Sequence, residues 1–346
     1  MRDLAVVGGG PVGLATALYA AQAGLDVVVL EPRAGTIDKA CGEGLMPAGL
    51  NALRGLGVAP DGYPFRGIRY LAGRRSVTAD FAAGPGLGVR RTTLHAALRQ
   101  AVSDAGVQVL PHRVSSLEQD ADGVEVEGVR ARYLVAADGL HSPLRRSLGL
   151  DRRPRGRSRF GLRRHVRTAP WSEYVDVHWG DGVEAYVTPV APDLVGVAVL
   201  TRLRGPFEQH LAAIPALQER LLSAEMTPAM GAGPLWQRSR RRVSGRVLLV
   251  GDASGYVDAL TGEGIALGLQ HAAAAVHAVL ADHPGGYEPA WRRLTYPHAA
   301  MTQGLLTLTR PPLLRRALVP AAAALPGVFA AAVNALAAGP RQHSSV

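Results

Sequence analysis

The sequence has very little cysteine and lysine. Cys41 is the only cysteine and Lys39 is the only lysine among 346 residues. A lone cysteine excludes an internal disulfide and makes a cysteine-based metal centre implausible, so no metal site is expected. Because arginine carries nearly all of the basic charge, the formal net charge of +10 comes almost entirely from guanidinium groups.

Aromatic residues are also scarce, at 5% of the chain. The basic clusters at 152–167 and 238–242 are not interleaved with aromatic side chains. Nucleic-acid-binding proteins usually combine basic patches with stacking aromatics, so no nucleic acid is expected as a partner. A solvated surface explains the clusters more simply, although positive charge would also favour an anionic cofactor.

No long uninterrupted apolar run is present. The most apolar late stretch, Ala317–Val333, is mostly alanine and contains Pro320 and Pro326, which favours two short packed helices over a membrane span. The chain enters an apolar segment at Leu4–Val7 without a signal-peptide pattern. Together with the lone cysteine, these features favour a cytoplasmic protein without firm membrane insertion.

The first fifty residues have the pattern of a βαβ unit. Apolar runs at Leu4–Val7 and Asp26–Leu30 predict strands, and Val12–Ala23 predicts a helix between them. Gly-x-Gly-x-x-Gly opens that helix, and an acidic residue, Glu31, ends the second strand, which is typical of a dinucleotide site. The predicted contacts are Gly8, Gly10, Pro11, Val12, Gly13 and Glu31. In the alternative interpretation, the glycines only make a tight turn.

A second strand–turn–helix pattern lies at Arg246–Ala272. Val247–Val250 predicts a buried strand that ends at Gly251-Asp252, and an Ala/Leu-rich helix is expected from about Thr261-Gly262. An aspartate at a strand end accepts hydrogen bonds from hydroxyl groups, and a helix start offers unpaired N–H groups and positive potential. A flavin has parts that suit both features.

The middle of the chain predicts further strands and a helix. A helix is expected over Arg91–Asp104, and a buried strand over Tyr133–Ala137. Four antiparallel strands are predicted at Phe160–Val166, Tyr174–Trp179, Val183–Val190 and Leu194–Leu200, with Gly67–Leu71 and Ser76–Phe81 as possible additions. We expect a loop at Gly84–Gly88 and a returning helix at Phe207–Ser223.

Three segments now stand in order: GGGPVG with Glu31, YLVAADGLHSPLRR at 133–146 and GDASGYVDALTGEGI at 251–265. Together they resemble the FAD-dependent superfamily that includes p-hydroxybenzoate hydroxylase-like enzymes, squalene epoxidases, flavin halogenases and geranylgeranyl reductases. The resemblance implies an α/β fold. In that fold a Rossmann-like FAD-binding domain of the glutathione reductase type carries an inserted antiparallel β-sheet substrate domain and C-terminal helices.

This resemblance sets the expected domain organisation. A discontinuous FAD-binding domain would comprise residues 1–66, 84–153 and 240–285. The substrate domain would comprise 67–83 and 154–239, and residues 286–346 would form a C-terminal helical segment. Those helices could cap the substrate site, form a homodimer surface or touch a membrane, so a monomer and a homodimer both stay open.

The resemblance also implies the FAD contacts. Arg91, in an R-x-x-L pattern, is similar to the family arginine that contacts the cofactor, and Asp252 would bind the ribityl chain. The turn at Thr261–Ile265 would face the edge of the ring that is negative when reduced. The implied cofactor-binding residues are Gly8, Gly10, Pro11, Val12, Gly13, Glu31, Arg33, Cys41, Gly42, Arg91, Val114, Asp138, Gly139, Asp252, Gly262, Gly264 and Ile265.

Within the superfamily, the motifs resemble the geranylgeranyl reductase and squalene epoxidase branch. The segment Lys39–Leu45 is similar to a reductase segment near the flavin ring, which makes Cys41 and Glu43 candidate catalytic residues. Tyr186 is the third candidate, because Tyr186–Pro189 resembles a shortened form of the reductases' substrate motif. Each has a simpler interpretation: Cys41 as a small loop residue, Glu43 as a helix-capping carboxylate, and Tyr186 as a strand core residue. Arg33 could equally be a surface charge.

The expected function is an FAD-dependent oxidoreductase acting on a hydrophobic small molecule. The preferred prediction is an NAD(P)H-dependent monooxygenase that uses O₂ to hydroxylate or epoxidise an aromatic, polyketide or isoprenoid molecule. It rests on the short chain, the solitary cysteine and the tryptophan of the reductases' Y-x-W-x-F-P substrate motif, which is missing at Tyr186–Pro189. The alternative is a geranylgeranyl-reductase-like C=C reductase or dehydrogenase. A non-catalytic flavin-binding protein is the third possibility. Without a second nucleotide motif, NAD(P)H is expected only as a transient electron donor.

Overall fold

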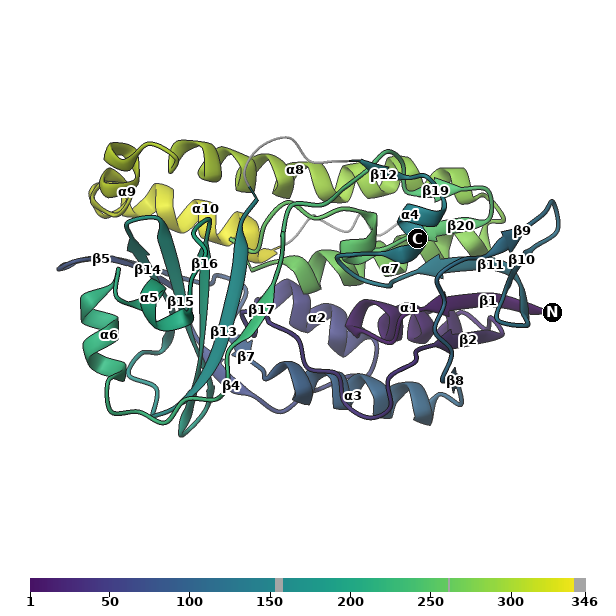
Figure 1. The fold of residues 1–346 in the computed structure, drawn as a ribbon, viewed down its shortest axis with the longest axis horizontal. Coiled ribbons are helices and arrows are strands. Elements are labelled where there is room, and N and C mark those ends of the chain that lie inside the picture. The colour runs from purple at the N-terminus through teal and green to yellow at the C-terminus, as the bar shows by residue number, and fades with distance from the viewer. Residues whose placement is uncertain (153–157, 261, 339–346) are drawn as a thin grey trace.

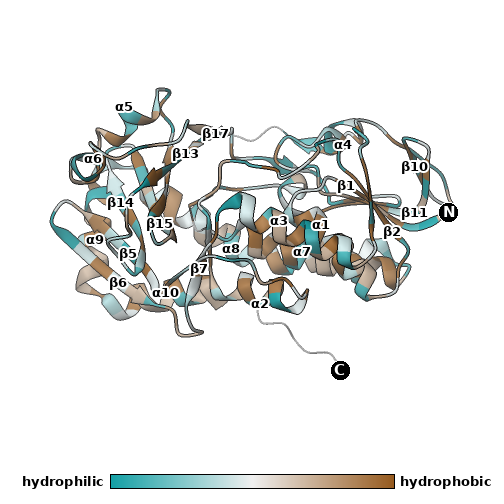
Figure 2. Ribbon diagram, turned by 90° about the horizontal axis from the view of Figure 1, so that it is seen from below, coloured by the Kyte–Doolittle hydropathy of each residue, from teal (hydrophilic) through white to brown (hydrophobic). Residues whose placement is uncertain are grey.

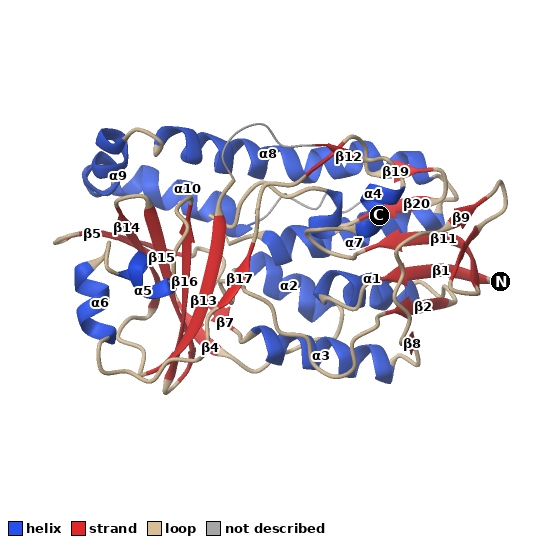
Figure 3. Cartoon of the chain, in the orientation of Figure 1, coloured by secondary structure: helices blue, strands red, loops and turns tan. Residues whose placement is uncertain are grey.

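A computed structural model describes residues 1–152, 158–260 and 262–338 of the chain (Figure 1). Two β-sheets lie at opposite ends of an elongated molecule, with helices running between and alongside them (Figure 3). Thr261, at the expected start of the late helix, lies outside the described residues.

The first sheet carries the N-terminal βαβ unit. Its main path runs in the order β19-β20-β11-β1-β2-β8, and β20, β11, β1, β2 and β8 pair in parallel. The strands are β1 (Arg2–Val7), β2 (Val27–Leu30), β8 (Gln108–Leu110), β11 (Val129–Ala136), β19 (Val243–Ser244) and β20 (Val247–Leu249), with β9 (Glu118–Gln119) and β10 (Val124–Val126) attached to β11.

Both faces of this sheet are buried, which is why its strands are apolar throughout rather than alternating. Leu4 and Val6 point to one face, where α1 (Pro11–Gln22) and α7 (Gly264–Leu280) pack. Ala5 and Val7 point to the other, beside the β9–β10 hairpin and α4 (Pro143–Ser147). The predicted strand–glycine–helix–strand order of the first fifty residues is confirmed.

The second sheet has seven strands in the order β17-β13-β16-β15-β14-β5-β6. They are β17 (Met230–Ala232), β13 (Phe160–Arg167), β16 (Leu194–Thr201), β15 (Val183–Ala191), β14 (Tyr174–Gly180), β5 (Gly67–Ala72) and β6 (Arg75–Asp80). All neighbours pair antiparallel except β14 and β5, which are parallel. The four predicted antiparallel strands and the two possible additions are therefore confirmed.

One predicted helix is wrong. The segment expected to be one helix over Phe207–Ser223 forms α5 (Phe207–Leu211) and α6 (Pro215–Leu221). Pro215 has no N–H for an intrahelical hydrogen bond and begins a new helix instead. Both helices cover one face of the seven-stranded sheet, through Phe207, Leu211 and Leu217.

The loop predicted at Gly84–Gly88 is also wrong. Gly86–Gly88 forms β7, which pairs with β3 (Gly44–Leu45) and β4 (Tyr63–Phe65). A Cβ on Gly88 would lie 1.7 Å from the carbonyl oxygen of Pro189, and one on Gly86 would lie 2.5 Å from the Phe65 ring. Gly88 marks the close approach of β7 to β15 of the seven-stranded sheet, and Gly86 leaves room for the Phe65 ring of the neighbouring strand β4, so neither marks a turn.

The C-terminal helices cover the other face of the seven-stranded sheet. Val319, Phe329 and Val333 pack against an apolar cluster that includes Val177 and Trp179. The helices are α8 (Tyr287–Leu308), α9 (Pro312–Ala324) and α10 (Pro326–Ala338); the remaining elements are α2 (Pro47–Gly55), α3 (Arg91–Asp104), β12 (Asp151–Arg152), β18 (Arg238–Ser239), and the short helices η1 (Gly251–Ser254) and η2 (Pro284–Gly286).

Among the described residues, no single helix is long and apolar enough to cross a membrane. The pair α9 and α10 passes a length and composition test jointly, but the two helices meet at an angle of 102°. The mixed fold therefore has a parallel sheet, an antiparallel sheet and C-terminal helices, as expected. The exact domain boundaries stay a prediction.

Candidate cofactor and active site

The glycine-rich turn after β1 is built from very close backbone contacts. A Cβ on Gly13 would lie 1.8 Å from the carbonyl oxygen of Gly8, and one on Gly8 would lie 2.5 Å from that of Ala137. Gly10 precedes Pro11, the first residue of α1, and no side chain caps this helix start. The first N–H groups of α1 therefore remain available to bind a phosphate at the edge of the sheet.

Glu31 ties the end of β2 to this turn. One carboxylate oxygen accepts a hydrogen bond of 2.8 Å from the Gly9 N–H, and both oxygens accept from the Arg33 guanidinium, at 2.7 and 2.9 Å. Burial alone would raise the pKa of Glu31, but the hydrogen bonds from Arg33 and Gly9 outweigh it and hold the pKa below its ordinary value. Glu31 is therefore an anion where a ribose is expected, and Arg33 is its partner.

His95 is a structural support that the sequence analysis missed. Its Nδ1 accepts a hydrogen bond from the Ile37 N–H at 3.2 Å, so Nε2 carries the ring proton and donates to the Gly9 carbonyl at 2.8 Å. Burial lowers the pKa of His95, in keeping with a neutral ring. His95 lies four residues after Arg91 on α3, a spacing that places both on one helix face and could have identified it.

Three cations converge beside the glycine turn. Burial lowers the pKa of Lys39, and the charges of Arg33 and Arg91 lower it further. Burial likewise lowers the pKa of Arg91, whose Nη1 is buried without a hydrogen-bond partner among the described residues. Arg33 is paired with Glu31, but three cations that repel one another, one of them with a buried nitrogen that has no partner among the described residues, are the arrangement expected for a site that receives an anionic group.

Two aspartates follow the ends of neighbouring strands. Asp138 follows β11; one of its oxygens accepts from the Leu144 N–H at 3.0 Å, and the other is buried with no partner in the described part of the chain. Asp252 follows β20. Burial raises the pKa of both carboxyl groups, although Lys39 and Arg91 act in the opposite direction on Asp252. Both positions suit hydrogen bonding to hydroxyl groups.

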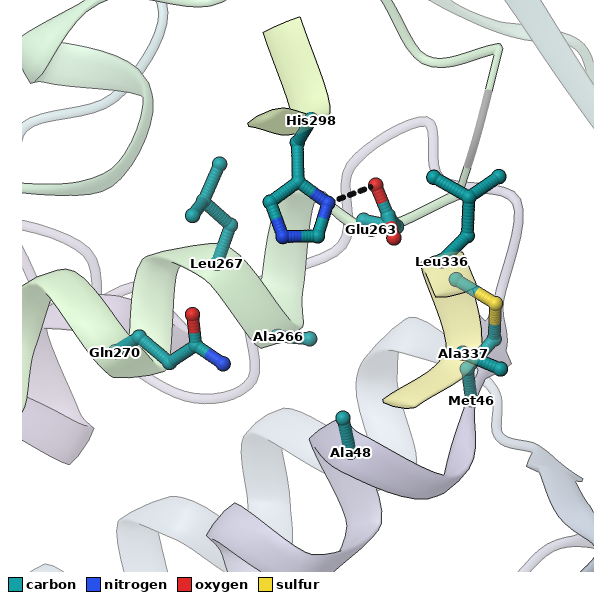
Figure 4. Close-up of a pocket in the computed structure, with 9 residues that line it drawn as sticks. All are labelled: Met46, Ala48, Glu263, Ala266, Leu267, Gln270, His298, Leu336 and Ala337. Carbon is teal, nitrogen blue, oxygen red and sulfur yellow. Dashed lines mark hydrogen bonds and ion pairs between the residues drawn. The ribbon is translucent and has the colours of Figure 1, made fainter. Parts of the chain in front are cut away.

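The start of α7 lies over a small pocket between α2, α8 and α10 (Figure 4). The helix begins at Gly264, with Glu263 as the preceding residue, and Gly262 has a positive φ of 69°. Glu263 and His298 both line the pocket, and Oε2 of Glu263 lies at hydrogen-bond distance, 2.8 Å, from Nδ1 of His298. Ile265 packs in the core between α1 and α3.

Cys41 and Glu43 lie on the segment that leads into β3. Glu43 is buried and has a positive φ of 61°, a conformation that strains a residue with a side chain. Its Oε1 accepts from the Arg91 N–H at 2.9 Å, at the first residue of α3. The helix-capping interpretation of Glu43 therefore describes one of its contacts correctly, and it is compatible with the predicted site role.

The other oxygen of Glu43 makes a contact that no local pattern predicts. Oε2 lies 2.8 Å from Nε2 of His165, on β13. Arg163 donates to Nδ1 of the same ring at 3.0 Å, so Nε2 carries the proton and donates to Glu43. Arg163 also pairs with Asp38 at 2.5 Å. This network joins the Cys41 segment to the antiparallel sheet.

Strand β15 contacts both segments that flank the predicted position of the flavin ring. Tyr186 donates to the Leu260 carbonyl at 2.8 Å, just before α7, and Thr188 donates to the Gly42 carbonyl at 2.8 Å. The Tyr186 hydroxyl is buried, which raises its pKa well above 10.0, and its proton is already engaged. Tyr186 therefore suits positioning better than proton donation.

The structure brings most of the predicted site residues to one edge of the parallel sheet. Val114 differs from the others, because its side chain is buried in the apolar cluster that contains Val28 and Leu30 of β2. The cradle of glycines and the partnerless Arg91 Nη1 and Asp138 Oδ1 fit the diphosphate and hydroxyl groups of FAD. The individual contacts stay predictions.

Comparison with known proteins agrees with this geometry. The family described as "FAD binding domain" matches residues 1–302. The chain belongs to this family. Menaquinone reductase of Mycobacterium tuberculosis is 31% identical over 88% of this chain and 87% of its own length. Digeranylgeranylglycerophospholipid reductase 1 of Methanothermobacter thermautotrophicus is 27% identical over 83% of this chain and 81% of its own length.

A solved structure has the same fold across nearly the whole molecule. A flavin-dependent brominase superposes with a TM-score of 0.79 at 16% identity, covering 97% of this chain and 95% of its own. The FAD-binding family membership makes the protein an FAD-dependent oxidoreductase, as predicted. The relatives that match along most of the chain favour the reductase alternative over the monooxygenase that the sequence analysis preferred.

Proposed function

We propose that this FAD-dependent oxidoreductase is a C=C reductase acting on a hydrophobic isoprenoid or quinone-linked molecule. The main support is the extent of the resemblance: the two reductases above match over more than four-fifths of the chain. A 3-(3-hydroxy-phenyl)propionate/3-hydroxycinnamic acid hydroxylase matches over only 43% of it. NAD(P)H is the proposed transient electron donor.

The chemistry of such a reduction defines what the chain must supply. Saturating a carbon–carbon double bond consumes one hydride and one proton, and bound FAD, once reduced by NAD(P)H, would supply the hydride. The protein must then hold a proton near the second carbon and keep bulk water away. The apolar cluster of the C-terminal helices against β14, with Trp179 and Phe329 among its members, is a packed core that would help to exclude water from this side of the antiparallel sheet.

Cys41 is the proposed proton holder. Burial raises the pKa of its thiol, so Sγ stays protonated at neutral pH. The Glu43 N–H donates to Sγ at 3.4 Å and fixes the side chain. Glu43 acts through its contacts with Arg91 and His165, which hold the segment in its left-handed conformation, and is therefore proposed as a positioning residue.

The test uses the FAD-loaded protein, NAD(P)H, and either a polyprenyl quinone or a geranylgeranyl lipid. We expect a product with two hydrogens added across an isoprenoid double bond, and not only a quinone reduced to its quinol, formed under argon, with no incorporation of isotopically labelled O₂ in air. Cys41→Ser, which retains a weaker acid of similar size, should slow saturation and enlarge the solvent deuterium isotope effect without releasing FAD. A product that contains labelled oxygen would instead support the monooxygenase, which the partial hydroxylase match favours.

A further inference from the structure

The outer face of α9 carries an apolar stripe. Leu314, Ala317, Ala321 and Leu325 follow one another at spacings of three or four residues, which places them on one side of the helix, and all four are exposed. Leu325 is 60% exposed, and Val328, at the start of α10, is 66% exposed. We call these five residues the outer stripe.

The outer stripe is exposed although α9 and α10 are correctly packed on the sheet, because a different side of these helices forms the core contact. The opposite side of the same helices is fully used: Val319 is completely buried, and the ring of Phe329 lies 4.8 Å from that of Tyr70 on β5. Moreover, residues 321–332 contain no polar side chain at all. Figure 2 shows α10 largely in brown shades, next to the sheet that it covers. Exposed apolar surface of this kind marks a docking face.

Charge identifies the partner. Between residues 289 and 338 the chain has no aspartate or glutamate, whereas it has five arginines: Arg292, Arg293, Arg310, Arg315 and Arg316. Two of them are paired with carboxylates outside this range, Arg292 with Glu288 and Arg316 with Asp181. Arg310 and Arg315 lie next to the first residue of the stripe in the chain. A second copy of this protein would bring the same positive face and a net charge of +10, so self-association through the stripe would be opposed by repulsion.

We propose that α9 and the start of α10 dock on an anionic lipid bilayer. The outer stripe enters the boundary between headgroups and acyl chains, and the flanking arginines contact the anionic headgroups. Because α9 and α10 meet at 102° and pack on the antiparallel sheet with their inner sides, they lie along the membrane surface and do not cross it. The docking does not depend on which reaction the flavin site performs.

The test is flotation of the full FAD-loaded protein with vesicles of phosphatidylglycerol and phosphatidylcholine, or of phosphatidylcholine alone. We expect strong binding only to the anionic vesicles, and weaker binding at high salt. The double variant Leu314→Ser/Leu325→Ser should lower the partition coefficient at least about tenfold. The matched control is Leu222→Ser, since Leu222 is 75% exposed at the end of α6, on the other side of the sheet.

All variants should retain FAD and the melting temperature of the parent, because every altered side chain is exposed. Equal binding of the double variant and the parent would overturn the proposal, as would no binding to anionic vesicles. The proposal would also be overturned if the parent forms a dimer in sedimentation, the double variant does not, and the parent does not bind lipid. That result would assign the outer stripe to contact with a second copy of the chain.

Discussion

The glycine turn at the parallel-sheet end and the contact of α9 and α10 with the antiparallel sheet depend on different physics. At the parallel sheet, backbone atoms approach within distances that only glycine permits, and buried charges are fixed by short hydrogen bonds. At the antiparallel sheet, α9 and α10 are held mainly by apolar side chains such as Val319, Phe329 and Val333. The glycine turn tolerates almost no change in shape, whereas the contact of α9 and α10 with the antiparallel sheet depends on side-chain volume and hydrophobicity. We expect the rigid region to bind the cofactor and the apolar region to serve a hydrophobic substrate.

The largest effect is expected from Gly13→Ala. The added methyl group would lie 1.8 Å from the Gly8 carbonyl oxygen, which is backbone and cannot move aside. We expect a loss of about 3 kcal/mol or more in the free energy of unfolding, together with loss of FAD. Urea unfolding measures this. Gly55→Ala is the control, since nothing lies within 4 Å of a Cβ there, and it should be neutral or slightly stabilising.

Glu43→Ala should cost about 3 kcal/mol, because the Arg91 N–H and the His165 Nε2–H would both lose their buried acceptor. Glu43→Gly removes the same acceptor but relieves the positive φ of 61°, so it should be less destabilised by about 1 kcal/mol. The comparison of the two variants in urea separates the contacts from the backbone strain. Equal unfolding energies would contradict the strained conformation.

Acid should weaken the fold through His271. Burial, and then the charges of Arg242 and His298, lower the pKa of His271 from 6.5 to about 3. Below the unfolded pKa the unfolded chain binds a proton that the folded protein does not, so stability falls as pH drops, by about 1.4 kcal/mol per pH unit. Between pH 6 and pH 4, His271→Gln should flatten the pH dependence of urea unfolding, whereas the exposed His283→Gln should leave the slope unchanged.

Arg91→Met sharpens the contrast further, because it should weaken FAD binding without weakening the fold. FAD affinity should fall about tenfold when a charged partner for the diphosphate is removed. The FAD-free protein should lose no stability, since the arginine is buried with a partnerless Nη1. Fluorescence titration with FAD and urea unfolding of the FAD-free protein measure the two quantities. Unchanged FAD affinity would place the diphosphate elsewhere.

Much of the parallel-sheet end could be predicted from sequence because its constraints are local. The helix Arg91–Asp104 has the predicted bounds, and the glycines at 8, 10 and 13 lie where the strand and helix meet. The contact between Glu43 and His165 could not be predicted, because it joins residues 122 positions apart in the chain. Gly86 and Gly88 were misread for a related reason: their neighbours, Phe65 and Pro189, lie on other strands.

The preference for oxygenation rested on the short chain, the solitary cysteine and one missing tryptophan near Tyr186. The Tyr186 hydroxyl instead donates a hydrogen bond to the Leu260 carbonyl. This part of β15 therefore connects the loop before α7 with the loop that contains Gly42. A single absent side chain in a substrate wall was therefore a weaker guide than the match along the whole chain. The shape of a substrate site depends on packing between residues far apart in the sequence, which local motifs do not encode.

The most direct test of the proposed reaction is a single turnover under argon. The FAD-loaded protein is reduced stoichiometrically, freed of excess reductant and mixed with a polyprenyl quinone or a geranylgeranyl lipid, and FAD reoxidation is followed by absorbance and the product by mass. The account predicts one saturated double bond per FAD reoxidised, without oxygen. Reoxidation only after air is admitted, with an oxygen atom in the product, would contradict it.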